Sequence, residues 1–210
     1  MATDETLNAF LDDLASSSPT PGGGSVAALA GALGAALISM VCSLTIGKKK
    51  YAAVEGEMKA IRAPSEELRK KFASLVERDA AAFNKVMEAY ALPKETDDQK
   101  ALRAAAVQAG TKEAALVPLE VMKHCIDAHA LAQEAAAKGN ENSVSDAGVS
   151  AIMIHAACES AALNVRINLR GINDMEFVGW KTEELDSLLK TSRVMLEETQ
   201  EIVERKIRRP

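Results

Sequence analysis

The segment from residue 26 to residue 46 is the feature that most restricts how this chain can fold. Its 21 residues carry no charge, and more than half of them are Ala, Gly, Ser or Thr. Small residues recur every four positions, as at Ala27, Gly31 and Ala35, a spacing that lets the backbones of neighbouring helices approach closely. The segment therefore predicts a helix that is buried on all sides, either at the centre of a bundle or at an oligomer interface.

A membrane-spanning helix is the alternative for this segment. Its length and the cluster Lys48-Lys49-Lys50 that follows it are typical of such helices. Its few Leu, Ile and Val residues provide little insertion energy, however, and the sequence shows no second hydrophobic span. We therefore expect no membrane association.

The composition extends the helical prediction to the whole chain. Alanine, the best helix former, supplies 38 of the 210 residues, whereas aromatic residues make up 3%. A β-sandwich or β-barrel of this length needs many more β-branched and aromatic residues. No linker divides the chain into two cores. We expect an all-α fold, one domain over residues 1–210, with about six to eight helices around the Ala/Gly-rich central helix.

Charge and cysteine content exclude several classes of function. A formal net charge of -5 is unsuited to general nucleic-acid binding, which needs a basic surface to replace phosphate counterions. The three cysteines lack CxxC spacing and the three histidines lack HExxH spacing, so neither a disulfide framework nor a metal site is expected. The acidic first residues do not resemble a signal peptide, and we expect a cytoplasmic protein.

Hydrophobic periodicity and helix-terminating residues divide the chain into segments. The expected helices are 8–14, 26–46, 54–91, about 100–138, 143–170 and 182–206. Ser25 is expected to cap the second of these helices, and the spacing of Ser143 and Asp146 matches a capping box for the fifth. Pro64 is expected to bend the third helix, and Pro118 to break or kink the fourth.

Three consecutive glycines, Gly22, Gly23 and Gly24, precede Ser25 at the start of the central helix. Glycine backbone next to a helix N-terminus exposes N–H groups and the positive end of the helix dipole, which suits an anion or another polar ligand. The loop is not a Walker motif, because no Gly-Lys-Ser/Thr follows, and no strand precedes it as a dinucleotide fingerprint requires. A flexible joint between two helices is the alternative.

Asp79 occupies a position where the pattern of the long helix predicts an apolar residue. The core-facing positions of that helix follow alternating steps of four and three: Ile61, Ser65, Leu68, Phe72, Leu75, Asp79, Phe83, Val86 and Tyr90. A buried carboxylate is unfavourable unless it is paired or hydrogen-bonded. Asp79 is thus either the partner of a cation such as Arg78, or a functional group that acts as a general base or binds an amide-like donor.

Further polar residues lie at other helix ends. The lysine cluster at residues 48–50 follows the C-terminus of the central helix, where cations favourably meet the dipole, although one lysine turned inward could bind an acidic substrate or donate a proton. Asp146, a candidate cap, and Asn164 point the same way on one helix. They are 18 residues apart, about 27 Å along the axis, so only a long ligand or a second subunit could unite them.

Five strings along the chain closely resemble the cyclodeaminase/cyclohydrolase family: PTPGGGSVAALAGALGAAL (19–37), LTIGKKKY (44–51), ERDAAAFNKVMEAYALPK (77–94), GNENSVSDAGV (139–149) and ALNVRINL (162–169). That family includes the C-terminal half of formiminotransferase-cyclodeaminase and the free-standing bacterial methenyltetrahydrofolate cyclohydrolases. The resemblance covers nearly the whole chain. It implies a helical, dimer-forming fold that binds tetrahydrofolate without a metal or redox cofactor.

The resemblance implies one of two reactions at the carbon that bridges N5 and N10 of the folate. A cyclohydrolase adds water to 5,10-methenyltetrahydrofolate and opens it to 10-formyltetrahydrofolate. A cyclodeaminase closes 5-formiminotetrahydrofolate to the methenyl form and expels ammonia. This chain carries no formiminotransferase half to supply the formimino substrate, so we expect the cyclohydrolase. A non-catalytic helical folate-binding or scaffold protein is the weaker alternative.

The residues identified above suit this chemistry. Asp79 is expected to deprotonate the attacking water, and Asp146 to act as second carboxylate or to bind the pterin amide. Lys48 is expected to protonate the departing nitrogen or to polarise the water. The expected substrate-binding residues are Gly22, Gly23, Gly24, Ser25, Tyr51, Asn84, Asn164, Arg166 and Asn168. Among them, the glycine loop and Ser25 are expected to hold the pterin or the aminobenzoyl carbonyl. Arg166 or a remaining lysine is expected to hold the glutamate tail.

Overall fold

The computed structural model describes residues 6–208, and within that range it contains helices and no β-strand. The helices are α1 (Leu7–Leu14), α2 (Gly23–Thr45), α3 (Glu55–Ala91), α4 (Asp97–Lys138), α5 (Val144–Leu169) and α6 (Met175–Ile207). Two short 3-10 helices connect them, η2 (Lys49–Val54) before α3 and η3 (Glu141–Ser143) before α5. The predicted all-α class is confirmed.

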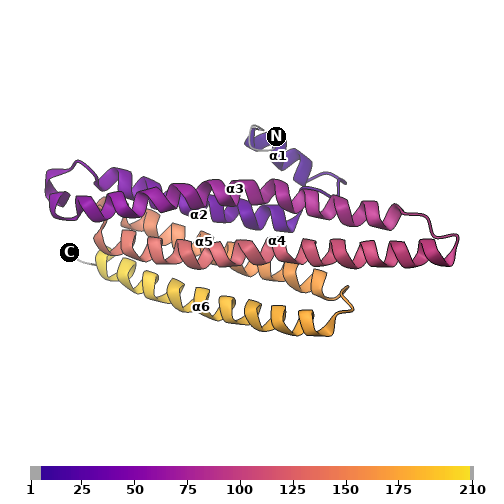
Figure 1. Ribbon diagram of the computed structural model, residues 1–210. Helices are drawn as coiled ribbons and strands as arrows, with labels where there is room; N and C mark the ends of the chain where they lie inside the picture. The colour runs from indigo at the N-terminus through magenta and orange to yellow at the C-terminus, as the bar shows by residue number, and fades with distance from the viewer. Residues whose placement is uncertain (1–5, 209–210) are drawn as a thin grey trace.

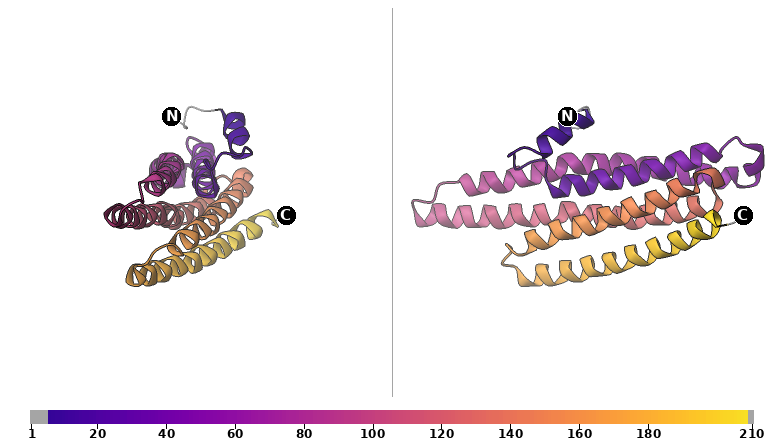
Figure 2. Two further views of the ribbon diagram at one scale, coloured as in Figure 1. Left: turned by 90° about the vertical axis from the view of Figure 1, so that its right-hand side faces the viewer. Right: turned by 180° about the vertical axis from the view of Figure 1, so that it is seen from behind.

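The five long helices run along a common axis and alternate in direction (Figure 1). α2 packs against α3 and α5, while α4 contacts α3, α5 and α6. α3 and α4 continue past the ends of their neighbours and form a projecting hairpin, which is also visible from behind (Figure 2). This difference in length matters for function, because it leaves the N-terminal end of α2 beside two helices that extend beyond it.

Glycines in α2 let two neighbouring helices approach its backbone closely. A Cβ added at Gly31 would lie 2.6 Å from the ring of Phe72 on α3, and one added at Gly34 would lie 2.6 Å from Ile154 on α5. Phe72 and Ile154 are fully buried, and much of the surrounding core is alanine. The prediction that small residues bring helix backbones together is confirmed.

Within the single chain the central helix is not buried on all sides, which contradicts a place at the centre of the bundle and leaves the oligomer interface as the predicted alternative. α2 exposes an apolar stripe, and so does its neighbour α5, because no helix within residues 6–208 covers these sides. The α2 stripe consists of Val26, Leu33, Met40 and Leu44, and the α5 stripe of Val149, Ile152, Leu163 and Ile167. Within each stripe the residue spacings correspond to whole numbers of helical turns, so its members share one helix face.

Two segments of the described chain are long and apolar enough to cross a membrane, where the sequence led us to expect only one. They are Gly23–Thr45, with a mean hydropathy of 2.1, and Glu141–Leu169, with a mean hydropathy of 1.2. The second was not expected, but α5 resembles α2 in its many small apolar residues and few charges. About half of each segment's most apolar window is buried inside the bundle.

Helix boundaries differ from the prediction where local capping or packing decides them. α6 begins seven residues before its predicted start, because the side chain of Asp174 accepts the N–H of Phe177 at 3.1 Å and caps the helix there. α4 begins earlier as well, with Thr96 as its cap. Pro64 and Pro118 lie inside α3 and α4, and both helices continue through them, so Pro118 does not break α4.

Two predicted caps are wrong. Ser25 is the third residue of α2, whose N-cap position is occupied by Gly22 without any side-chain bond. Ser143 occupies the N-cap position of α5, but its hydroxyl donates to the carbonyl of Asn140 at 2.9 Å and accepts no N–H from α5, so the predicted capping box does not form. Ser25 bonds to α3 and Ser143 to its own preceding turn, so each hydroxyl has a hydrogen-bond partner that competes with capping.

Polar residues enter the core where α4, α5 and α6 meet. The hydroxyl of Ser192 lies 2.9 Å from Nε2 of His129 and 2.9 Å from Nδ1 of His155. Burial, reinforced by the neighbouring His155, lowers the pKa of His129 from 6.5 to about 4. His129 is therefore neutral in the folded protein at neutral pH, while the same residue in the unfolded chain binds a proton below about pH 6.5.

We expect the protein to lose stability on acidification because of His129. Its folded pKa of about 4 lies below the unfolded value of 6.5, so between these pH values the unfolded chain binds the additional proton and is favoured. The expected loss is about 3 kcal/mol by about pH 4. Urea unfolding as a function of pH measures it, with His129→Gln as comparison because an amide can still bond to Ser192. Identical pH dependence in the two proteins would contradict the assignment.

Candidate functional site

A cavity of about 330 Å³ lies at the N-terminal end of α2, where α2, α3, α4 and α5 meet. Its lining residues are Pro19, Thr20, Gly22, Gly23, Gly24, Asp79, Phe83, Val86, Ala114, Asn164, Ile167 and Asn168. Apolar walls with a few polar groups are typical of small-molecule sites, and the volume falls at the lower end of their range.

α3 carries Asp79 into this cavity. The predicted inner stripe of α3 is buried as far as Leu75, where the helix packs along α2. One turn further, at Asp79, α2 reaches its N-terminal end, and α3 continues past it into the projecting hairpin (Figure 1). The next stripe residues, Asp79, Phe83 and Val86, line the cavity, with Asp79 beside the first turn of α2 and Val86 beside Gly110 of α4. Tyr90, further along the stripe, is exposed.

The carboxylate of Asp79 lies against the first turn of α2. Ser25 donates a hydroxyl hydrogen bond to its Oδ2 at 2.9 Å, and a Cβ added at Gly24 would lie 2.0 Å from its Oδ1. The first turn of a helix has N–H groups without acceptors and carries the positive end of the dipole, which favours an anion. The glycine loop thus allows a carboxylate of the same chain to approach the helix terminus.

Asp79 is a partly buried carboxylate without a cationic partner. Burial raises its pKa above the ordinary value of 3.8, and the hydroxyl and backbone N–H of Ser25 act in the opposite direction. Pairing with Arg78 does not occur, because both terminal nitrogens of Arg78 bind the carboxylate of Glu120 at 2.8 Å. Among residues 6–208, no Lys, Arg or His forms an ion pair with Asp79. Such a group suits proton abstraction or the stabilisation of a cation.

Two predicted amide ligands complete the polar lining. Nδ2 of Asn164 donates to the carbonyl of Ser160 at 2.9 Å, and Nδ2 of Asn168 donates to the carbonyl of Ala114 at 2.9 Å. A Cβ added at Gly23 would lie 3.3 Å from Nδ2 of Asn164, so the glycine loop and this amide are neighbours. Each amide is held by a backbone carbonyl and retains a second N–H hydrogen and a carbonyl oxygen with which to bind a ligand.

Lys48, Tyr51 and Asp146, which the sequence also assigns to the site, lie at the opposite end of the bundle. The 23 residues of α2 separate that end from Gly24, a distance of about 33 Å along the helix axis. All three lysines of the cluster at residues 48–50 are exposed. No single chain can therefore bring these groups and Asp79 to one atom of a ligand.

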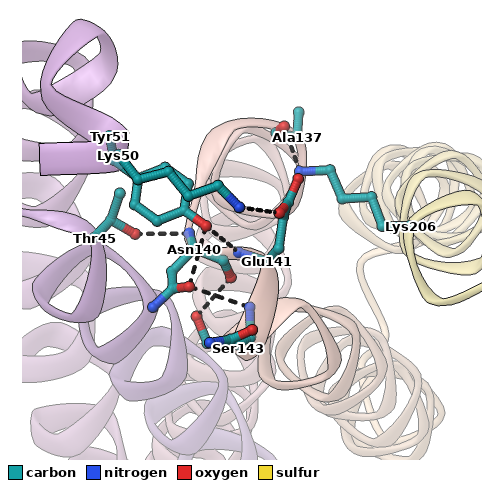
Figure 3. Close-up of polar contacts among 9 residues, drawn as sticks. Thr45, Lys50, Tyr51, Ala137, Asn140, Glu141, Ser143 and Lys206 are labelled. Atoms are coloured by element: carbon teal, nitrogen blue, oxygen red, sulfur yellow. Dashed lines mark hydrogen bonds and ion pairs between the residues drawn. The ribbon is translucent and has the colours of Figure 1, made fainter. Parts of the chain in front are cut away.

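Tyr51 joins the two short 3-10 helices at that end (Figure 3). Its hydroxyl donates to Oδ1 of Asn140 at 3.2 Å and accepts the backbone N–H of Glu141 at 3.0 Å. Asn140 in turn donates its backbone N–H to Thr45 at 2.8 Å. Lys50 binds the carboxylate of Glu141 at 2.5 Å, and this contact raises the pKa of the lysine. The described contacts of Tyr51 thus tie η2 to η3.

Two other predicted ligands lie outside the cavity. Asn84 is exposed on α3, and Arg166 reaches across to Asp186 on α6 at 3.2 Å. The apolar walls of the cavity were not among the predicted site residues. Phe83 and Val86 belong to the stripe that revealed Asp79, so the signal was present, whereas nothing in the sequence marked Ile167.

Within residues 6–208 no group of three or more His, Cys, Asp or Glu side chains is arranged to hold a metal ion.

The chain is similar to proteins that are named as cyclohydrolases or cyclodeaminases. The model of the formiminotransferase-cyclodeaminase family matches residues 6–187. A methenyltetrahydrofolate cyclohydrolase of Methylorubrum extorquens is 48% identical over 99% of this chain and 100% of its own length. The formimidoyltransferase-cyclodeaminase of Mus musculus is 35% identical over 90% of this chain, which spans 35% of that longer protein. A formiminotetrahydrofolate cyclodeaminase crystal structure from Thermotoga maritima matches with a TM-score of 0.89 and 34% identity, covering 99% of this chain and all of that one.

Substituting Gly24 tests whether the glycine loop exists to admit Asp79. In Gly24→Ala the new Cβ would overlap Oδ1 of Asp79, so the carboxylate or α2 must move, at an expected cost of roughly 1–3 kcal/mol. Gly56→Ala is the matched control, because Gly56 is the second residue of α3 as Gly24 is of α2, and an added Cβ would have no atom within 4 Å, so stability should not fall. Thermal unfolding of both variants measures the difference. Equal stability of the two would show that Gly24 is only a joint.

Proposed function

Since this chain belongs to the formiminotransferase-cyclodeaminase family, we propose that it is an enzyme of one-carbon metabolism that hydrolyses 5,10-methenyltetrahydrofolate to 10-formyltetrahydrofolate. The observation that carries the proposal is the carboxylate of Asp79, which faces a cavity, is partly buried and forms no ion pair with any residue in the range 6–208. The Methylorubrum extorquens relative, similar over its whole length, bears the name of this activity.

The proposed reaction is a hydration followed by opening of a ring. The methenyl carbon belongs to an amidinium cation, which a nearby carboxylate stabilises, and the water that attacks this carbon must lose a proton, which Asp79 accepts. The hydroxyl group then becomes the formyl C=O as the bond from carbon to N5 breaks, and N5 takes up a proton. The formyl group stays on N10, and one proton is released overall.

The remaining predicted residues divide into two groups in this proposal. Gly22, Gly23, Gly24, Asn164 and Asn168 line the cavity that contains Asp79 and are proposed to bind the pterin or the aminobenzoyl carbonyl. Lys48, Tyr51, Asp146 and Arg166 lie elsewhere, and Asn84 is exposed near the cavity. Lys48 remains the proposed proton donor to N5, and Asp146 the proposed second carboxylate or pterin-amide ligand.

A homodimer would reconcile these positions. The exposed stripes of α2 and α5 are apolar along most of their length, which is typical of surfaces that another chain covers. Two copies packed in opposite directions through these stripes would bring the lysine end of one subunit next to the cavity of the other. We propose that the active site forms at this interface, where a long, flat folate could contact both subunits.

The proposal has two further parts. Water addition and ring opening transfer no electrons, so the reaction itself requires no redox cofactor. We also propose a cytoplasmic location, which agrees with the buried free thiols of Cys42, Cys125 and Cys158.

Cyclodeamination is the second candidate function. The structurally similar protein from Thermotoga maritima, 34% identical over 99% of this chain, is named a formiminotetrahydrofolate cyclodeaminase. Both reactions pass through a tetrahedral carbon between N5 and N10, so the same carboxylate could serve either. The methenyl absorbance separates the two: purified protein should consume 5,10-methenyltetrahydrofolate and should not release ammonia from 5-formiminotetrahydrofolate. Ammonia release would identify a cyclodeaminase, and no change with either substrate would refute the proposal.

Asp79→Asn should lower turnover at least about 100-fold, because the amide cannot accept the proton from water. The variant should unfold at the same or a higher temperature at neutral pH. The folded pKa of Asp79 is raised, so above it the ionised group destabilises the fold relative to the unfolded chain, and the amide removes this cost. Asp98→Asn, on the exposed start of α4, is the control. Activity of Asp79→Asn within threefold of wild type would exclude Asp79 as the base.

Charge on the α2 stripe should separate the proposed dimer. Leu33 is 50% exposed in the single chain, and Leu33→Glu would place a carboxylate in the interface. We expect the mass measured by light scattering to fall by half and turnover to fall at least about tenfold. Leu102→Glu is the control, because Leu102 is 69% exposed on α4 and outside both stripes. A monomeric wild-type protein with full activity would overturn the proposed interface.

A further inference from the structure

Ser25 does not face the cavity, although the sequence suggests that it binds substrate. Ser25 is 0% exposed and does not line the cavity, whereas the preceding residues Gly22, Gly23 and Gly24 do. Its side chain points from the first turn of α2 toward α3. A role other than substrate contact is therefore needed to explain a fully buried hydroxyl beside the proposed base.

The hydroxyl of Ser25 has two acceptors on α3 and a single hydrogen. It lies 2.9 Å from Oδ2 of Asp79 and 3.3 Å from the backbone carbonyl of Val76. A hydroxyl donates one hydrogen bond and can accept two more, so it can bond to only one of these oxygens as a donor at a time. Rotation about the C–O bond is sufficient to change from one acceptor to the other.

These two acceptors match the two protonation states that a general base must adopt. When Asp79 is ionised, Ser25 donates to Oδ2, and a hydrogen bond to a charged acceptor is about twice as strong as a neutral one. When Asp79 has taken a proton from water, the new O–H can donate to Ser25, whose own hydrogen turns to Val76. In both states every buried polar group in the contact has a partner, which avoids the cost of an unsatisfied group.

We infer that Ser25 is a positioning residue that holds Asp79 in both its ionised and its protonated form, and that it does so without touching the substrate. The inference rests on the proposed function in one respect, namely that Asp79 cycles between these forms during turnover. Gly24 contributes by admitting the carboxylate to within reach of the hydroxyl, since any Cβ there would displace it.

Removing the hydroxyl should disfavour the ionised form more than the protonated one, because the charged hydrogen bond is the stronger of the two. In Ser25→Ala the acidic limb of the kcat/KM profile, which requires ionised Asp79, should therefore move to higher pH. We expect roughly a tenfold loss of kcat/KM on that limb and a smaller loss at alkaline pH. KM should change little, since Ser25 does not contact the substrate.

The matched control is Ser150→Ala. Ser150 is also fully buried, and its hydroxyl donates to the carbonyl of Gly34 at 2.8 Å across the contact between α5 and α2. This variant loses a buried hydroxyl without touching Asp79, so its pH profile should keep the wild-type shape. Ser25→Cys keeps nearly the same volume with a weaker donor, and it provides an intermediate case if Ser25→Ala does not fold.

A second measurement needs no substrate. Infrared difference spectra of protein labelled with carboxyl-¹³C aspartate, with Asp79→Asn subtracted, follow the titration of Asp79 directly. The midpoint should move to higher pH in Ser25→Ala, move less in Ser25→Cys, and stay unchanged in Ser150→Ala. This readout still decides the role of Ser25 if the protein proves inactive toward 5,10-methenyltetrahydrofolate, so failure of the inference and failure of the proposed function are distinguishable.

Two results would overturn the inference. An unmoved Asp79 titration, with kcat reduced equally at every pH, would reduce Ser25 to a packing residue. A raised KM with unchanged kcat and an unmoved titration would instead make it a substrate ligand, as the sequence alone suggests.

Discussion

The close approach of other helices to the backbone of α2 is the contact on which the rest of the structure depends. At Gly31 and Gly34 it brings Phe72 and Ile154 against the helix, and at Gly24 it admits the carboxylate of Asp79. In all three places a Cβ would lie closer than 3 Å to an atom of the neighbouring helix. The packing that builds the core and the packing that positions the proposed base therefore both depend on the absence of a Cβ on α2.

The unequal lengths of the helices create a cavity at the N-terminal end of α2. α3 and α4 have 37 and 42 residues, and α2 has 23, so the two longer helices continue past the N-terminus of α2. The inner stripe of α3 loses its apolar neighbour at that point and becomes the wall of a cavity. A carboxylate is tolerable there because Ser25 and the terminal N–H groups of α2 stabilise its charge, while partial burial keeps it basic.

Much of the fold could be predicted from local pattern. Alanine content and the scarcity of aromatic residues indicated helices, and the spacing of apolar residues located most of them. Errors occurred at helix ends, where Asp174 starts α6 early, Ser25 bonds to α3, and Ser143 bonds to its own preceding turn instead of capping α5. A cap depends on which acceptor or donor lies nearest in space, and residue type alone does not reveal that.

The sequence by itself determined the helical class, the small-residue contacts of α2 and the anomaly of Asp79, because each is a periodic property of one helix. Only the tertiary structure decided which polar residues share a site. It placed Asn164 beside Gly23, because α2 and α5 run in opposite directions, and it put Lys48 about 33 Å from the carboxylate at the other end of the same helix. Spacing along a chain determines the face of a helix on which a residue lies, whereas proximity between helices depends on their direction, length and order of packing.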